Sequence, residues 1–502
     1  MTGEAPQSGQ TRRATLWVFA ALSLWLALLL VTHTASRSPY TYGAQALEPP
    51  FVVTRSANPD AWTVYGVTRF FYDGSTPEWT IAHNMHLPLH SFSTAIVAAF
   101  ARPYMLANVL ANYVFLLLLT AAALRLGERM NIRPVAMLVA LGTVYVLPPF
   151  AGYIGQPMQY IVGPVVSFLI VLAAVALPEE DLRNPWIAGA LTAILIVNYD
   201  WYVYGAALAV YIFFIVRMKL KDALIYTIVA IAPAMVWHSF LMRASNGAIS
   251  AKVHNDFLFN VFAGYLHVLF NFPQQFLMPF TVSHIGLYIA LHQIIAMIYW
   301  PLVVCCVAVL WLGRPRIGTF RGNYLVALLV AFFFLEQMAT AVFDWENSPR
   351  RAMPVVLAFA WAYCWAAGRM MGKRRWNWIF ATLLAITAFL SYADVIFHKP
   401  ENAALYQGDA IRKPAKHNLK FRKSELVIAA TPDPDPRQAA MRSTFPPSRV
   451  RGLSAAFWAG QAFAGACLLG LLWLAARARL LPRYTPHAAA ALWGVSLLVR
   501  LL

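Results

Sequence analysis

The residue types best suited to chemistry lie in two segments that are far apart in the chain. Asp60 follows Asn58-Pro59, a sequence typical of a helix start, and Arg350 and Arg351 directly precede an apolar run. A carboxylate at a helix start stays ionised and can accept a proton from an alcohol. A guanidinium offers a planar fork of donors that fits a phosphate. We therefore predict a base and an anion site, with a helix cap and an interfacial anchor as the alternatives.

Three histidines, His83, His86 and His90, are spaced by three and four residues, as on one face of a helix. This spacing could hold a metal, but Pro88 interrupts such a helix. No Cys or carboxylate nearby completes a tetrahedral set. We predict that the three side chains contact phosphate or sugar at a membrane entrance, with a zinc site as the less favoured alternative.

The composition excludes a soluble domain. Of 502 residues, 60% are hydrophobic and 12% are charged, whereas soluble domains carry about 25% charged residues. The net charge of +18 comes mainly from short loops between apolar runs, so we expect no nucleic-acid partner. The four Cys fall inside apolar runs and form no disulfide framework or Cys-x-x-Cys site. An all-α polytopic membrane protein is predicted.

The apolar runs predict about thirteen transmembrane helices of roughly 20 residues each. The first, Leu16 to Thr32, follows Arg12 and Arg13 and could be a signal peptide, although its length favours an uncleaved anchor. Later runs begin near Tyr104, Pro134, Ile161, Trp186, Tyr202, Ala223, Ile285, Tyr324, Met353, Trp376, Ala455 and Ala488.

Basic residues recur in every second short loop, which predicts a cytoplasmic N-terminus. This requires that the segment Asn198–Tyr204 is a turn between two spans. The basic loops are those around Arg125 to Arg133, Arg217 to Lys221, Arg314 to Arg321, Arg369 to Arg375 and Arg477 to Arg483.

Four parts are predicted along the chain. They are a cytoplasmic N-terminus (1–15), a transmembrane catalytic module (16–397) whose outer loop (36–103) carries interfacial helices, a basic Pro-rich outer loop (398–454) and C-terminal transmembrane helices (455–502). The basic loop is either a solvated connector or a segment that folds over an outer cavity and recruits an anionic acceptor or headgroup.

The order and spacing of these features resemble the GT-C fold glycosyltransferases, the superfamily of the protein mannosyltransferases and aminoarabinose transferases. The resemblance rests first on one span followed by a long outer loop with Asp60, an aromatic amphipathic helix and His86-Leu87-Pro88-Leu89. The next span, ANVLANYVFLLLLTAAALRLGERM, is similar to the second helix of that family. Arg351-Ala352-Met353-Pro354 resembles the opening of a late helix in many members.

The resemblance implies transfer of a sugar from a polyprenyl-phosphate donor to a glycan, lipid or protein acceptor at the periplasmic face of the inner membrane. Asp60 would be the base, and Arg350 and Arg351 would hold the donor phosphate. Many members carry a pair of acids, whereas here Asp73 and Glu78 are the nearby second acids. These two are assigned to substrate binding with the three histidines, and a divalent cation is possible.

Two other functions fit the membrane architecture. A ligase or polymerase of lipid-linked glycans would use outer-face Arg and His residues in a large late loop, for which 398–454 is a candidate. A transporter or flippase would need broken helices with charge near the bilayer centre. The ionisable residues lie mostly at predicted helix ends, so the transporter is the least favoured.

Overall fold

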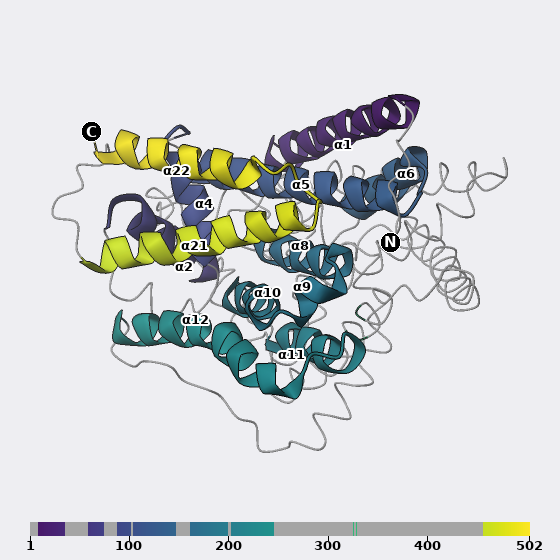
Figure 1. Cartoon of the computed structure of the whole chain (residues 1–502). Helices are drawn as coiled ribbons and strands as arrows, with labels where there is room; N and C mark the ends of the chain where they lie inside the picture. The colour runs from purple at the N-terminus through teal and green to yellow at the C-terminus, as the bar shows by residue number, and fades with distance from the viewer. Residues whose placement is uncertain are drawn as a thin grey trace, which may run out of the picture.

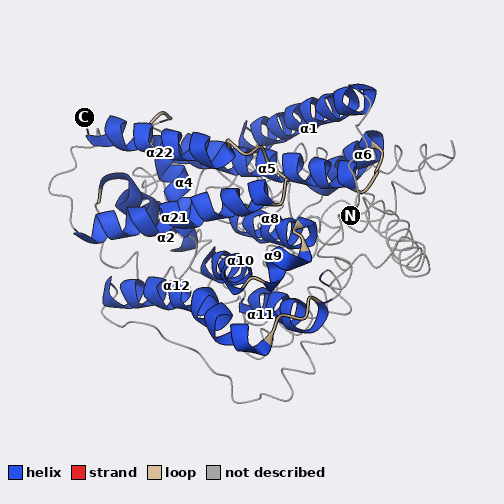
Figure 2. Cartoon of the chain, in the orientation of Figure 1, coloured by secondary structure: helices blue, strands red, loops and turns tan. Residues whose placement is uncertain are grey.

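The structure, a computed structural model, describes 9–35, 59–74, 88–101, 104–146, 161–198, 202–244, 325, 328 and 455–501. All regular elements in these residues are helices, with no strand among them (Figure 2). Four helical segments are long and apolar enough to cross a membrane: Arg12–Leu30, Leu106–Arg129, Leu220–Trp237 and Ala455–Arg477. The chain is thus a helical membrane protein. The total of thirteen spans involves segments outside the described residues and stays a prediction.

Eight of the described helices begin within three residues of a predicted apolar run. They are α5 (Tyr104–Arg129), α6 (Pro134–Val146), α8 (Val162–Ala176), α10 (Pro185–Asn198), α11 (Tyr202–Val210), α12 (Ala223–Ala244), α21 (Ala455–Arg477) and α22 (Thr485–Leu501). Several helices, including α6 and α10, open with Pro at the first position, where its fixed φ suits a helix and its missing N–H costs nothing.

The first helix, α1 (Gly9–Ala35), packs against α5 and α6. Its buried face carries Leu22, Leu26 and Leu29. The hydroxyl of Tyr113 in α5 donates a hydrogen bond to the carbonyl of Ser23, at 3.1 Å. In the structure α1 is therefore part of the bundle, and its role as an uncleaved anchor stays a prediction.

The centre of the described bundle is α8, nearly all of whose residues are buried. It contacts α5, α10 and α21, and α10 packs against α12. A Cβ on Gly189 of α10 would lie 2.7 Å from Cβ of Val229, so glycine is needed for the close approach of α10 and α12. Small residues commonly allow such contacts between membrane helices.

The basic turns that the structure describes meet at one end of the bundle. Arg129 donates to the carbonyls of Ala478, at 2.7 Å, and Ala176, at 3.2 Å. The short helix α9 (Glu179–Arg183) follows α8, and Arg183 donates to the carbonyl of Val216. The turns after α5, α8, α11 and α21 thus lie together, as expected for loops on the cytoplasmic side.

The two helices expected in the first outer loop are present at the opposite end. They are α2 (Pro59–Asp73) and α4 (Pro88–Ala98). Figure 1 shows α4 running across the direction of α5, α21 and α22. Both helices contact α21, and α4 also contacts α5, α8, α10 and α22. These two helices of the predicted outer loop are therefore built into the bundle and are not only laid on its surface.

Candidate active site

The predicted base, Asp60, is the second residue of α2, so the helix start expected at Asn58-Pro59-Asp60 is confirmed. This places the carboxylate in the first helical turn, where the helix dipole favours negative charge. The described side chains of α2 begin further along, at Val64. An outward cavity facing Asp60 therefore stays a prediction.

The other end of α2 is held by the two C-terminal helices. The carbonyl of Phe71 accepts hydrogen bonds from Nε2 of Gln461 in α21, at 2.6 Å, and from Nη1 of Arg500 in α22. The Phe71 ring stacks on Trp237 of α12, with centroids 6.3 Å apart. It also meets the edge of Phe92 in α4. All these contacts fix the C-terminal turn of α2 against the bundle.

Asp73 lies at this fixed end and pairs with Arg69 one turn earlier, at 2.5 Å. Thirteen residues separate it from Asp60, which at about 1.5 Å per residue is about 20 Å along the helix. That distance is too great for both carboxylates to act on one hydroxyl. The assignment of Asp73 to substrate binding stays a prediction, but it cannot supply a catalytic pair with Asp60.

His90 of α4 is fully buried, and its Nε2 is 2.8 Å from Nδ2 of Asn108 in α5. Because an amide nitrogen only donates, Nε2 accepts and the ring proton is on Nδ1. Burial lowers the pKa of His90 to about 3. The imidazole is therefore neutral at pH 7 and can donate a hydrogen bond, but it cannot attract a phosphate as a cation.

Two hydroxyls share this face of α4. Ser93 and Thr94 are three and four residues after His90, and their side-chain oxygens, like Nδ1 of His90, have no hydrogen-bond partner among the described residues. In contrast, Thr120 and Thr192 donate to the carbonyl four residues earlier, as is common in apolar helices. This face of α4 thus offers neutral polar groups to the interior of the bundle.

The start of α4 is capped by a residue of another helix. Oδ1 of Asn198, at the end of α10, accepts a hydrogen bond from the backbone N–H of Leu89, at 3.2 Å. Nδ2 of the same side chain donates to the carbonyl of Ile194. Since the first N–H groups of a helix have no partner within it, Asn198 supplies one of the bonds that α4 itself lacks.

The remaining predicted site residues lie outside the described part of the chain. They are Glu78, His83, His86, Arg350 and Arg351, and the basic loop 398–454 also lies outside it. Their approach to Asp60 stays a prediction. Within the described residues, no group of three or more His, Cys, Asp and Glu could hold a metal ion.

Sequence reasoning missed Arg500, Gln461, Asn108 and Asn198. Arg500 stands alone in the apolar run ALWGVSLLVRLL, and a lone charge in such a run is a functional candidate by default. The amides had a weaker signal, namely polar side chains that can join helices inside a membrane. Which helix each one reaches depends on the tertiary packing.

The described fold is that of a helical membrane protein with two short helices fastened at the end opposite the basic turns. No protein-family model and no curated protein sequence matches the chain. Among solved structures it is similar to ArnT from Cupriavidus metallidurans bound to undecaprenyl phosphate, at 13% identity and a TM-score of 0.45. The match covers 96% of this chain and 77% of that one.

Proposed function

We propose that the chain is an integral membrane glycosyltransferase of the GT-C type, with its active site at the outer face. It would move a sugar from a polyprenyl-phosphate donor to a glycan, lipid or protein acceptor. The observation that carries the proposal is the helix α2, which begins with Pro59-Asp60 and is fastened at the end of the bundle opposite the basic turns. The sequence resemblance supplies the reaction type.

The reaction would be a single inverting displacement. The Asp60 carboxylate accepts the proton of an acceptor hydroxyl while that oxygen bonds to the anomeric carbon of the donor. The bond from the anomeric carbon to the phosphate oxygen breaks, and polyprenyl phosphate leaves with the bonding electrons. Arg350 and Arg351 would stabilise the phosphate charge, so that positioning and electrostatics supply most of the acceleration.

In the part of the chain that the structure describes, the position of buried charge supports an enzyme more than a transporter. Among the described residues, the charged side chains that are buried are Glu128, near the end of α5, and Arg500, near the end of α22. They lie at opposite ends of the bundle. A transport pathway would instead place ionisable groups near the bilayer centre.

The test is an assay of the purified protein in nanodiscs with a panel of polyprenyl-phosphate sugars and candidate acceptors, following release of polyprenyl phosphate. Asp60→Asn should lower kcat by about 10² to 10⁴, the usual contribution of a general base. Arg351→Gln should weaken donor use. Asp181→Asn, at the opposite end of the bundle, is the matched control and should leave kcat unchanged.

Two outcomes would count against the proposal. One is full activity of the Asp60→Asn protein, which would show that Asp60 is not the catalytic base. The other is the absence of polyprenyl phosphate release with every donor, combined with movement of a lipid-linked sugar across the bilayer, which would support a flippase.

A further inference from the structure

The C-terminal turn of α2 receives its cap from the far end of the chain. The last carbonyls of a helix have no partner within the helix. In α2 the N–H of Gly74, at a φ of +77°, bonds back to the carbonyl of Phe70 at 3.0 Å. The next two carbonyls, of Phe71 and Tyr72, both lie within hydrogen-bond distance of Nη1 of Arg500.

The Arg500 side chain is buried, and contacts with its own helix and with Tyr72 hold it in place. Arg500 is 1% exposed and Phe71 is fully buried. Nε of Arg500 donates to the carbonyl of Ser496 in its own helix, at 3.0 Å, and its guanidinium lies 5.9 Å from the Tyr72 ring. A cation at a helix C-terminus also interacts favourably with the helix dipole. The side chain therefore has one orientation, directed at the end of α2.

A second side chain ties the same carbonyl to the same two C-terminal helices. Gln461 of α21 donates to Phe71 O through Nε2, and its Oε1 accepts from Nε1 of Trp493 in α22, at 3.2 Å. The Trp493 ring meets the edge of the Phe92 ring in α4, with centroids 5.5 Å apart. The ends of α2 and α4 thus share one support, made by α21 and α22.

Because α2 is a continuous helix, a change at its capped end shifts its first turn, which contains Asp60. Asp60 is 11 residues from Phe71, or about 17 Å along the helix, so a tilt of roughly 5° would move it by about 1.5 Å. A displacement of about 1 Å can cost 10²-fold in rate when a reacting group must be aligned. A change at the cap on Phe71 can therefore lower the reaction rate by displacing Asp60, although the two residues do not touch.

We propose that Arg500 is a positioning residue, which holds α2 at the angle that brings Asp60 to the acceptor hydroxyl. The inference rests on the proposed function for its catalytic part. Its structural part, the fastening of α2, stands on the contacts of Phe71 and Tyr72 alone.

The experiment compares Arg500→Gln, Arg500→Lys and Gln461→Leu with Arg483→Gln, which removes an exposed charge from the opposite end of the bundle. Hydrogen–deuterium exchange over 59–73, donor KM, kcat and the thermal midpoint are measured for each protein in nanodiscs. We expect Arg500→Gln to accelerate exchange in α2 and to lower kcat at least about 10-fold, with donor KM changed less than about twofold. Arg500→Lys, which keeps the charge, should recover part of kcat. The control should match the wild type.

The outcomes distinguish the fastening of α2 from the positioning of Asp60. Unchanged exchange in α2 for both Arg500→Gln and Gln461→Leu would overturn the inference whether or not the protein is an active transferase. Faster exchange with unchanged kcat would overturn the positioning role. If Arg500→Gln does not fold, Gln461→Leu removes a donor to the same carbonyl without a change of charge. If the wild type is inactive with every donor, the proposed function and the positioning role both fail, and faster exchange shows only the fastening.

Discussion

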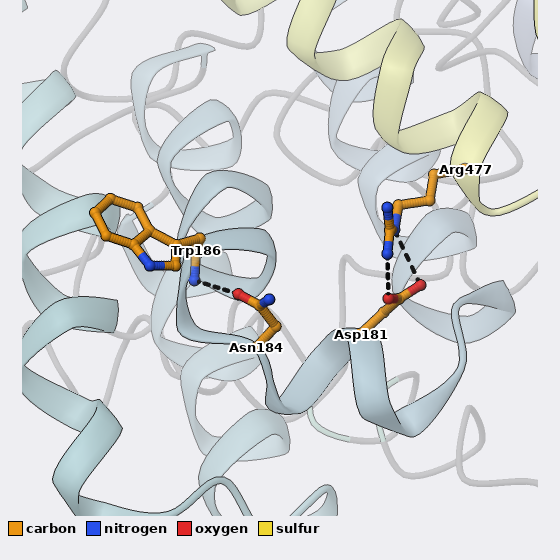
Figure 3. Close-up of polar contacts among 4 residues, drawn as sticks. All are labelled: Asp181, Asn184, Trp186 and Arg477. Atoms are coloured by element: carbon orange, nitrogen blue, oxygen red, sulfur yellow. Dashed lines mark hydrogen bonds and ion pairs between the residues drawn. The ribbon is translucent and has the colours of Figure 1, made fainter.

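Arg477 and Asp181 form a two-point ion pair at the end of the bundle where the basic turns meet. Nη2 and Nε of Arg477 donate to the two carboxylate oxygens of Asp181, at 2.6 and 3.1 Å (Figure 3). The pair joins the end of α21 to α9, which is 296 residues earlier in the chain. The guanidinium also lies 5.4 Å from the Trp473 ring. Both ends of α21 are thus tied to early parts of the chain, at Asp181 here and at Phe71 on the other side.

The contacts of α21 at Asp181 and at Phe71 should differ in their contribution to stability. The Arg477 and Asp181 side chains are 41% and 19% exposed, so water and salt screen the pair. We expect Asp181→Asn to change the thermal midpoint in nanodiscs by only a small amount, and less at high salt. A loss comparable to that of Arg500→Gln would contradict this expectation.

Gly465 should not tolerate a methyl group. A Cβ there would lie 2.5 Å from the Trp493 ring, which Gln461 and Phe92 hold in place. Gly465→Ala should therefore lower the thermal midpoint, since overpacking costs about 1–3 kcal/mol. Gly494→Ala, on the partner helix, is the matched control, because its Cβ meets nothing within 4 Å. Equal midpoints for the two variants would mean that α21 and α22 are not in close contact.

Asn198 should matter more than another asparagine at a helix start. Asn198→Ala leaves the buried N–H of Leu89 without its acceptor, which costs about 1–3 kcal/mol. Asn184 caps α10 through the N–H of Trp186 at an exposed position (Figure 3). Asn184→Ala should give the smaller drop in thermal midpoint. The reverse order would place α4 away from α10.

His90 should make the protein sensitive to acid. Its pKa is about 3 in the fold, against an ordinary value of 6.5. Since the unfolded chain takes up the proton first, the stability contributed by the neutral imidazole is complete above pH 6.5 and is lost as the pH falls toward 3. The slope is at most about 1.4 kcal/mol per pH unit. Between pH 4 and 6.5, His90→Gln should show a shallower fall in thermal midpoint than the wild type. Parallel curves would contradict the burial of His90.

The described helix ends predict that the two termini lie on opposite sides of the membrane. Arg12 precedes the first apolar run, whereas Arg500 contacts α2 at the outer end. A single Cys is placed either before residue 9 or after Leu501, and sealed vesicles of both orientations are treated with a membrane-impermeant maleimide. Each Cys should react in one orientation, and the two should react in opposite ones. Replacement of all four native Cys (Cys305, Cys306, Cys364 and Cys467) by Ala gives the background. Labelling of both ends from one side would contradict the topology.

More of the fold than of the site could be predicted from the sequence. Apolar runs bounded by Pro and basic residues gave the helix starts of α5, α6, α12 and α21 to the residue. Hydropathy could not show that α10 has 14 residues, about 21 Å, and so is shorter than the hydrocarbon layer. Its end is determined by where Asn198 meets Leu89 in α4, a contact between distant segments.

For the site, local patterns were informative and tertiary contacts were not. Asn58-Pro59-Asp60 predicted the start of α2, and the spacing of Arg69 and Asp73 is that of a pair on one helical face. The three histidines were treated as one surface group. The structure instead buries His90 in the bundle as a neutral side chain, because α4 lies against α5. No periodicity in the first outer loop encodes that contact.

The cap on α2 also sets an order of events during biosynthesis. Phe71 and Arg500 are 429 residues apart, and a ribosome that adds about 5–20 residues per second needs roughly 20 to 90 s to make that interval. During nearly all of this time the newly made α2 lacks Gln461 and Arg500, the two donors that later fix its end. If Asp60 acts as proposed, its helix reaches its final position only when nearly the whole chain has been translated, although Asp60 is among the first residues made.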